Sequence, residues 1–483
     1  MKKKNIRVTL IGFLLVGLLG SMSSCTTDYV TGRKTFSLIS ESQEVAMGKE
    51  ADPQIVAEYG VYDDPDLAAY VSNLGKQLAE KSHRPQLEYT FRLLDSPVVN
   101  AFALPGGYVY VTRGILAHFN SEDELAGVLG HEIGHVVARH SAEQLSRQQL
   151  AGLGLGLGVV LWEDFRPYAE MAGASLNLLL LKYSRGQESE SDMLGVEYSS
   201  KLGYDARDMA GFFGTLKALG AESGQSLPSF MSTHPDPGDR EVRVNRLAGE
   251  AQQKAGYKPL NVDRYEYLRR IDGIVYGDDP RQGYVENNVF YHPEMRFQFP
   301  VPADWIVMNT PSTVLMASPD KKAVIQLTLG KADSPALEAD EFVAGEGITV
   351  IARRNTSVRG FTAVILETQI ASQDGLIRVL SYFIQKDNHV YVFHGYSLTE
   401  QFAGYSQTFV SVMGGFDKVT DQTVLNKQPS RLRVRKVTTG GSLESVLRQM
   451  GVPEAKLSEL AIVNGKKLSD PVKTGEWVKT VGN

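Results

Sequence analysis

The sequence predicts an α+β protein with three folded parts: a mainly helical region with a small sheet, an α/β sandwich-like domain, and a small βααβ module. Three observations indicate this. Between residues 41 and 272, apolar residues recur mostly at the three- and four-residue spacings of helices. Between residues 280 and 416 they alternate or run together, as in strands. After a polar linker at 417–430, residues 431–483 read as a strand, two helices and a closing strand.

Size and composition agree with a chain of several packed domains. The 483 residues are too many for one ordinary domain, and 42% hydrophobic with 22% charged residues is normal for globular proteins. The formal net charge is −6, whereas a nucleic-acid-binding protein usually carries a concentrated basic surface. We therefore expect no nucleic-acid partner.

Residues 1–24 are predicted to be a secretory signal peptide. A basic stretch at residues 2–7 precedes an apolar run at 8–19 that is too short to span a bilayer. Small residues then lead to Cys25, the single cysteine of the chain, and resemble a bacterial lipobox in which Met22 replaces the commoner leucine. The resemblance implies cleavage before Cys25 and a lipid on its sulfur. The alternative is an ordinary signal peptide cut nearby, with Cys25 discarded or free.

Lipidation would make residues 25–40 a tether. The protein would then be exported and lipid-anchored to a cell-envelope membrane, facing the periplasm. Because the chain has no second cysteine, no disulfide holds its domains, and their cores alone must stabilise them.

The stretch "SEDELAGVLGHEIGHVVARHS" predicts a helix that carries metal ligands. Ser121 and Glu124 have the spacing of a capping box. His131 and His135 are four residues apart and so share one helix face, where two imidazoles can bind one tetrahedral zinc ion. Glu132 beside them would be the general base of this H-E-x-x-H pattern. The alternative is a pair of partly buried histidines hydrogen-bonded within a core. His140 points off that face, which predicts a structural or supporting role rather than a ligand.

A catalytic zinc site needs a third protein ligand and an open position for water. The segment "SRGQESESDMLG" reads as a second helix, on which Glu188 and Asp192 share a face while Glu190 points elsewhere. Glu188 can reach the metal, and Asp192 can accept a hydrogen bond from a ligand histidine. The alternative is a solvated acidic helix start.

Four blocks in this order carry a family resemblance: "NAFALPGGYVYVTRGIL", "HEIGHVVARHS", "SRGQESESDMLG" and "STHPDPGDR". Over residues 41–255 they resemble peptidase family M48, the HtpX- and BepA-like zinc gluzincins. The resemblance implies a zincin-type fold and one Zn²⁺ per chain. It implies His131, His135 and Glu188 as zinc ligands and Glu132 as the catalytic base. The family usually has Glu-x-x-Ala-Asp, and Ser191 here replaces the alanine.

The resemblance also implies roles for residues around the metal. It implies a substrate-binding edge strand at Asn100, Ala101, Phe102 and Ala103. His234 matches a histidine that can approach the zinc as a fourth ligand and hold the enzyme off; the alternative is a histidine that only orders its loop. Arg240 matches an arginine near the active site, which either orients the loop or steadies the oxyanion.

The regions after residue 272 carry weaker resemblances. The sheet-rich accessory domain at 280–416 resembles a PsbP-type α/β sandwich and shows no catalytic constellation, so we expect it to act in recognition. The module at 431–483 resembles LysM, which implies either peptidoglycan binding or docking on the chain or a partner.

Two functions follow from these observations. The first is a zinc-dependent endopeptidase of the bacterial cell envelope that cleaves unfolded or misassembled proteins in quality control. The second is a protease-fold chaperone or assembly scaffold with latent activity gated by His234. The complete set of catalytic residue types favours the first.

Overall fold

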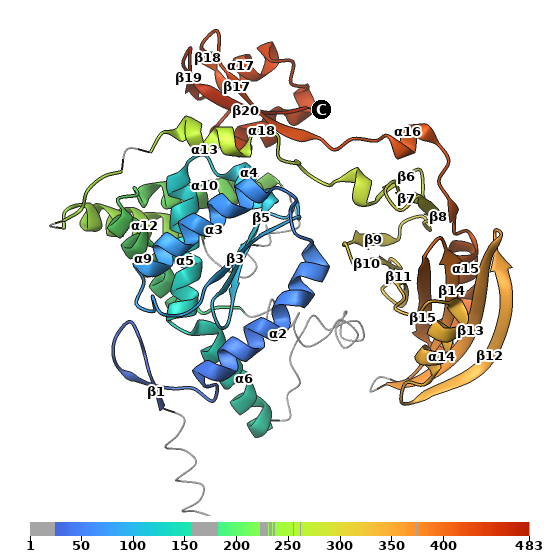
Figure 1. Ribbon diagram of the computed structural model, residues 1–483. Coiled ribbons are helices and arrows are strands. Elements are labelled where there is room, and N and C mark those ends of the chain that lie inside the picture. Colours follow the sequence, from blue (N-terminus) through green and yellow to red (C-terminus); the bar gives the residue numbers. More distant parts are fainter. Residues whose placement is uncertain are drawn as a thin grey trace, which may run out of the picture. The chain divides into compact units, whose positions relative to one another are not determined.

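The computed structural model describes residues 25–155, 182–222, 230, 234, 237–254, 256–260, 262–372 and 375–482 (Figure 1). The predicted signal peptide therefore lies outside the described residues. The chain divides into two compact units. The first comprises residues up to 56, 60–277 and 431–482, and the second comprises 57–59 and 278–430. Helices and sheets are both present, as the α+β prediction requires.

The first unit is mainly helical and encloses a three-stranded sheet, β3-β5-β4, with β4 at an edge. A short hairpin of β1 (Cys25–Thr27) and β2 (Lys34–Phe36) precedes it, within the predicted tether. Its sheet strands are β3 (Thr90–Leu94), β4 (Ala101–Leu104) and β5 (Tyr108–Thr112). Its helices are α2 (Glu41–Tyr59), α3 (Pro65–Glu80), α4 (Arg113–His118), α5 (Glu122–Val137), α6 (His140–Leu155), α9 (Arg185–Leu202), α10 (Arg207–Glu222), α12 (Pro237–Gln252) and α13 (Arg264–Ile271).

Helices α5 and α9 begin at side-chain caps, but not as the sequence predicted. The Ser121 hydroxyl accepts from the Glu124 N–H, while the Glu124 carboxylate accepts from Asn120 N instead of Ser121 N. The expected capping box on α5 is therefore half formed. The complete box is on α9, between Ser184 and Gln187.

Helices α5 and α9 approach each other closely because glycines face each other. A Cβ added to Gly195 of α9 would lie 2.9 Å from the backbone nitrogen of His131. One added to Gly134 of α5 would lie 3.1 Å from Ser191 Cα. Both positions meet backbone atoms, which cannot turn away as a side chain can. The close approach holds the predicted ligands of the two helices at a fixed spacing.

Residues 431–482 fold as strand, helix, helix and strand, and they pack into the first unit. Apolar side chains of this segment, among them Leu432, Leu443 and Leu460, belong to the same core cluster as α5. The Nζ of Lys479, a fully buried residue, donates to the carbonyls of Ala117 and Phe119. Its elements are β17 (Arg431–Lys436), β18 (Gly441–Ser442), α17 (Leu443–Gln449), the 3₁₀ turn η4 (Glu454–Lys456), α18 (Leu457–Val463), β19 (Pro471–Val472) and β20 (Trp477–Gly482).

The second unit is built on a seven-stranded antiparallel sheet in the order β12-β13-β14-β15-β11-β10-β9. A four-stranded sheet, β16-β8-β7-β6, accompanies it, so Asp417–Lys418 of the predicted linker form a strand. The strands are β6 (Tyr284–Glu286), β7 (Val289–His292), β8 (Phe297–Pro300), β9 (Ile306–Asn309), β10 (Thr313–Ala317), β11 (Ala323–Leu329), β12 (Ile348–Val358), β13 (Phe361–Ser372), β14 (Gly375–Lys386), β15 (His389–Leu398) and β16 (Asp417–Lys418). Its helical segments are η3 (Pro280–Gln282), α14 (Pro335–Val343), α15 (Thr399–Gly414) and α16 (Gln422–Leu425).

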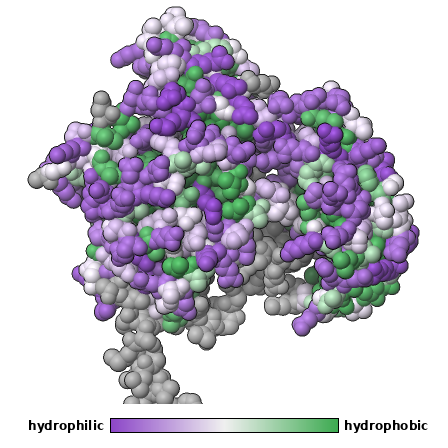
Figure 2. Space-filling view, viewed as in Figure 1, coloured by the Kyte–Doolittle hydropathy of each residue, from purple (hydrophilic) through white to green (hydrophobic). Residues whose placement is uncertain are grey.

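The visible surface is mostly hydrophilic, with hydrophobic residues in separate patches (Figure 2). The apolar side chains gather instead in the core of each unit. Among the described residues, none of the helices combines the length and the apolar character needed to cross a membrane.

Candidate metal centre

Four buried side chains of the first unit converge as a candidate metal site. His131 and His135 come from α5, Glu188 from the first turn of α9, and His234 from the chain before α12. One ligand atom from each lies within 4.8 Å of all the others, and all four residues are buried. The structure thus brings together the three predicted zinc ligands and the predicted fourth one.

The spacing of these atoms fits a tetrahedral zinc ion. Zinc–ligand bonds of about 2.0–2.1 Å place neighbouring ligand atoms roughly 3.3 Å apart. His131 Nε2 lies 3.0 Å from His135 Nε2 and 3.3 Å from His234 Nδ1. Glu188 Oε1 lies 2.9 Å from His234 Nδ1 and 3.5 Å from His135 Nε2, and Glu188 Oε2 lies 3.7 Å from His131 Nε2.

Glu132 lies beside the cluster with both carboxylate oxygens buried and without a hydrogen-bond partner among the described residues. Such an acceptor is costly to bury unless it serves a ligand, a water or a reaction. Burial raises the pKa of Glu132, and its Oε1 is 3.6 Å from His234 Nε2. A carboxylate with a raised pKa next to a metal site is suited to act as a general base.

The outer nitrogen of His131 is held by an ionic network. Its Nδ1 lies 3.1 Å from Asp192 Oδ1. Arg240 donates to both Asp192 oxygens at 2.7 and 3.0 Å, and Arg243 donates to Asp192 Oδ2 at 2.7 Å. Burial alone would raise the pKa of Asp192, but Arg240 and His131 hold that pKa well below its usual range. Asp192 is therefore an ionised acceptor for the proton of His131.

Arg240 also pairs with a predicted ligand. Its Nη1 lies 2.8 Å from Glu188 Oε2, and its side chain is 3% exposed. Of the two roles that the family resemblance implies for Arg240, orienting the site is the one that these contacts support. The guanidinium links the carboxylates of Glu188 and Asp192, both on α9, to α12.

The outer nitrogen of His135 has a different neighbour. Its Nδ1 is 3.0 Å from Nδ1 of His140, whose Nε2 is 3.3 Å from Glu190 Oε2. The expectation that Glu190 points away from the metal holds, but its contact with His140 was not predicted. The ring of Tyr183 also lies close to that of His135, 4.0 Å away between centroids. Nothing in the sequence pattern signals Tyr183, because its position depends on tertiary packing.

His234 is placed by an aromatic stack as well as by its polar contacts. Its ring lies 4.5 Å from that of Phe230, nearly parallel at 23°. Together with its contact to Glu188 this fixes the imidazole within the ligand set.

The predicted substrate strand is at an edge of its sheet. Ala101, Phe102 and Ala103 belong to β4, which pairs only with β5 among the described strands, and Asn100 immediately precedes them. All four residues are buried, and Asn100 Oδ1 has no hydrogen-bond partner within the described part of the chain. Cys25, the predicted lipidation site, is the first residue of β1.

The comparisons with known proteins agree with this geometry. Residues 65–250 match Peptidase family M48. The mitochondrial metalloendopeptidase OMA1 of Schizosaccharomyces pombe is 32% identical over 229 residues, which cover 47% of this chain and 67% of that protein. The chain belongs to peptidase family M48. The family resemblance inferred from the four sequence blocks is thereby confirmed.

Other M48 relatives are bacterial. The Beta-barrel assembly-enhancing protease of Yersinia pestis is 32% identical over 260 residues, covering 51% of this chain and 52% of that protein. The protein of the same name from Escherichia coli K12 is 29% identical over 259 residues, covering 51% and 53%. The chain thus spans about half the length of these bacterial relatives.

Among solved structures, cyanobacterial PsbP (CyanoP) from Synechocystis matches 28% of this chain and 91% of its own, with 14% identity and a TM-score of 0.23. So low a score supports no conclusion about the fold of the second unit, and the PsbP-type sandwich stays a prediction.

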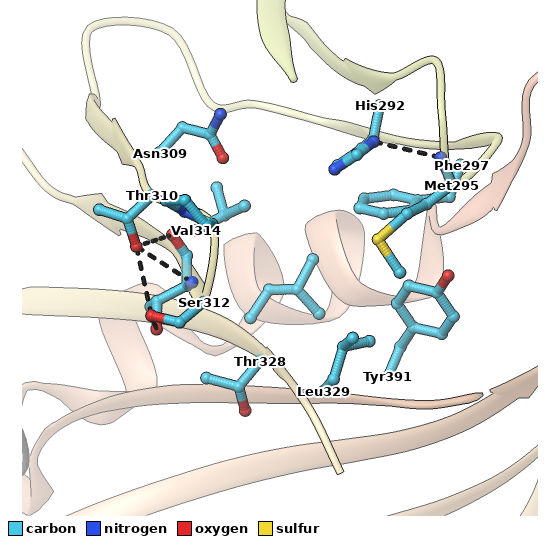
Figure 3. Close-up of a pocket in the computed structure, with 13 residues that line it drawn as sticks. His292, Met295, Phe297, Asn309, Thr310, Ser312, Val314, Thr328, Leu329 and Tyr391 are labelled. Atoms are coloured by element: carbon cyan, nitrogen blue, oxygen red, sulfur yellow. Dashed lines mark hydrogen bonds between the residues drawn. The ribbon is translucent and has the colours of Figure 1, made fainter. Parts of the chain in front are cut away.

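The second unit has a small hollow of about 40 Å³ of its own (Figure 3). Phe297, Leu329 and Tyr391 contribute apolar surface, while Asn309 and Ser312 are polar and uncharged. Burial lowers the pKa of His292, which also lines the hollow, to about 4, so this imidazole is neutral near pH 7. The hollow therefore presents no charged group among its described lining residues.

Proposed function

We propose that the protein is a zinc-dependent endopeptidase of the bacterial cell envelope that cleaves unfolded or misassembled proteins. The observation that carries this is the convergence of His131, His135 and Glu188 next to the unpartnered carboxylate of Glu132. Three such ligands with an adjacent base are the donor set of a catalytic zinc site. The M48 membership supports the same reaction class.

In this proposal each residue has a definite task. When bound, zinc would polarise the scissile carbonyl and lower the pKa of a water molecule to about 7. Glu132 accepts the proton of the attacking water and later passes it to the leaving amine. Asp192 and Arg240 keep His131 and Glu188 oriented. The edge of β4 would pair with an extended substrate through backbone hydrogen bonds, which gives little sequence preference.

The envelope location is part of the proposal. It rests on the signal-peptide pattern of residues 1–24 and on the predicted lipid at Cys25. The names of the bacterial relatives, proteases that enhance beta-barrel assembly, support a role in quality control of envelope proteins. Membrane attachment would be through the lipid.

Latent activity is the second candidate, and the position of His234 favours it specifically. Its Nδ1 lies 2.9 Å from Glu188 Oε1 and 3.3 Å from His131 Nε2, so it stands where a fourth ligand would. A fourth protein ligand would occupy the position that the catalytic water needs. In this form the protein would act as a chaperone or scaffold until His234 moves away.

We propose recognition roles for the other parts. The second unit would act in recognition, and its small uncharged hollow suits an apolar side chain of a client protein better than a charged one. Residues 431–482 keep the LysM-like order of elements, which supports peptidoglycan as a candidate partner. Their packing into the core of the first unit supports a structural role beside it.

The deciding experiment measures cleavage of an unfolded model protein by residues 26–483, beside Glu132→Gln and His234→Ala, with zinc content determined for each. Cleavage by the wild type that Glu132→Gln abolishes without loss of zinc would establish the peptidase. Activity in His234→Ala alone would establish the gated form. Bound zinc without activity in any variant would favour the scaffold, and absence of zinc would overturn the ligand assignment.

A further inference from the structure

We propose that His140 and Glu190 are positioning residues for the metal ligand His135, forming a hydrogen-bonded relay from its outer nitrogen to the protein surface. This rests on the proposed function in one respect: it takes His135 to be a ligand through Nε2. Neither His140 nor Glu190 belongs to the H-E-x-x-H pattern, and neither is the third ligand.

The relay consists of two consecutive contacts. His135 Nδ1 lies 3.0 Å from His140 Nδ1, and His140 Nε2 lies 3.3 Å from Glu190 Oε2. The side chain of His140 is 2% exposed, whereas that of Glu190 is 30% exposed. The chain of contacts therefore begins at the metal cluster, crosses a buried imidazole and ends at a carboxylate that reaches solvent.

The proton positions along the relay follow from the chemistry of imidazole. A histidine that binds metal through Nε2 carries its remaining proton on Nδ1. Nδ1 of His135 must then donate, so Nδ1 of His140 must accept. An imidazolium at His140 would have hydrogens on both nitrogens and could not accept this bond. His140 is accordingly neutral with its proton on Nε2, where it donates to the Glu190 carboxylate.

Ser191 adds a contact at the position where the family usually has alanine. Its hydroxyl lies 3.3 Å from His140 Nδ1 and is fully buried. Most members of the family would have alanine here, and alanine cannot make this contact. The hydroxyl lies at the same nitrogen that accepts from His135. That nitrogen has a single lone pair, so the hydroxyl can share it only as a second, weaker donor. The contact helps to place the His140 ring, and Nε2 remains available to Glu190.

The two histidine ligands of α5 consequently have unequal support. His131 donates to Asp192, a carboxylate held by two arginines. His135 donates to a neutral imidazole whose carboxylate partner is partly in water. An anionic acceptor makes its histidine a stronger donor to the metal than a neutral acceptor does. The relay is thus the weaker of the two sets of contacts that orient the histidine ligands.

The test is zinc affinity, measured by equilibrium competition with a chelator for the full-length mature chain. His140→Phe keeps an aromatic ring but cannot accept, and we expect zinc affinity to fall about 10- to 100-fold. His140→Gln offers an amide oxygen as acceptor and should recover most of that loss. Glu197→Gln is the matched control, since Glu197 lies on the same helix with a 33% exposed side chain. It should bind zinc as the wild type does, whereas Glu190→Gln should bind it several-fold more weakly.

A second readout does not depend on activity. In the ¹⁵N-histidine-labelled, zinc-loaded protein, the resonance that disappears in His140→Gln should have the Nε2-protonated pattern. An Nδ1-protonated or doubly protonated His140 would overturn the relay even though zinc is bound. So would wild-type zinc affinity in His140→Phe, or equal losses of affinity in His140→Phe and His140→Gln. A wild-type chain that binds no zinc would overturn the proposed function, and with it the premise that His135 is a ligand.

Discussion

The two units of the chain treat buried charge in opposite ways. The first unit buries a dense set of ionisable side chains, including Glu44, Arg113, Asp192 and Arg240. In the described part of the second unit, the buried charged side chains are Asp279 and Lys386. The core of that unit is otherwise built from aromatic and aliphatic residues. The first unit therefore carries the desolvation cost of many buried charged groups, whereas the second unit carries it for few.

The difference shows where function is concentrated. Burying a charge is unfavourable unless a partner and hydrogen bonds compensate it, and replacing such groups by apolar ones is often neutral or stabilising. The charges of Glu188 and Asp192 are paired with arginines and converge on one cluster of imidazoles. This network stabilises the protein less than apolar residues could, but it fixes the positions of the side chains in the candidate metal site.

The largest expected effect comes from deleting residues 431–483. The deletion removes the buried Leu432, Leu443 and Leu460 together with neighbouring core residues from the first unit. Apolar residues of α4, α10 and α13, the helices that contact this segment, would face water instead, at a cost of about 1.5–3 kcal/mol for each side chain fully exposed. A few such side chains are enough to offset much of a typical stability of about 5–15 kcal/mol. We expect the first unit to unfold while the second stays folded.

Tryptophan fluorescence can measure this, because Trp305 lies in the second unit. In a variant in which Trp305 is the only tryptophan, the cooperative denaturant transition should survive the deletion, and zinc binding should vanish. A truncated chain that still binds zinc would show that the segment is a separable module.

Arg240→Met should have the next largest effect. It leaves Glu188 and Asp192 with uncompensated buried charge, which costs about 3–5 kcal/mol of unfolding free energy. The counterpart in the second unit is Arg378→Met, which removes a pair with Glu367 whose side chains are 33% and 25% exposed. That pair contributes about 1 kcal/mol or less.

Single-tryptophan chains can separate the two units here as well, with Trp477, stacked on Tyr265, reporting the first and Trp305 the second. If denaturant titrations show that both variants lose the same unfolding free energy, the two units do not differ in their dependence on buried ion pairs.

A matched pair of glycines gives a smaller effect. Gly195→Ala places a methyl 2.9 Å from the backbone of α5, whereas Gly395→Ala meets the side chain of Phe409 at 2.7 Å. Overpacking costs about 1–3 kcal/mol at either site. Only Gly195→Ala should also weaken zinc binding, because it separates the helices that carry His131 and Glu188. Zinc affinity and unfolding free energy, measured on both variants, check this; loss of zinc in Gly395→Ala would argue against it.

The effects of pH have opposite signs in the two units. Burial lowers the pKa of His394, in the second unit, to about 4, below the usual 6.5. The unfolded state binds this proton first, so stability present above pH 6.5 is lost as the pH falls toward 4, by roughly 3 kcal/mol. His394→Asn should flatten that slope in the transition reported by Trp305.

In the first unit, burial and the neighbouring Asp208 and Asp205 raise the pKa of Asp123 to about 6, above the usual 3.8. The folded state then binds the proton first, so this carboxyl costs stability as the pH rises from 4 through 6. Asp123→Asn should raise the unfolding free energy at pH 7 by about 2 kcal/mol, and leave it nearly unchanged at pH 4. Destabilisation at pH 7 would show that the carboxylate is compensated.

The metal site could be predicted where it depends on local periodicity. His131 and His135 share a helix face by their spacing, and so do Glu188 and Asp192. That the two helices meet through Gly134 and Gly195 is a tertiary fact that no spacing reveals. His234 and Arg240 came from the family resemblance, since their distance along the chain gives no geometric signal.

Two further features could not be predicted because they too depend on tertiary packing. The contact of His140 with His135 depends on the bend after α5, where Arg139 adopts a positive φ of 60°. The sequence of residues 431–482 predicts a strand, two helices and a strand whether the segment folds as a separate module or packs into the first unit. Only the structure shows that Lys479 donates to carbonyls at the end of α4.

That embedding has a consequence for the order of events during biosynthesis. The first unit is interrupted by residues 278–430 and is completed by β20, which contains Lys479 and is made after the second unit. While the chain is emerging, the second unit has nearly all its residues before the first unit does. The core around α5 therefore closes only after residues 431–482 have been made. We expect the ligands of α5 and α9 to remain unassembled on the nascent chain until then, which delays assembly of the proposed catalytic site.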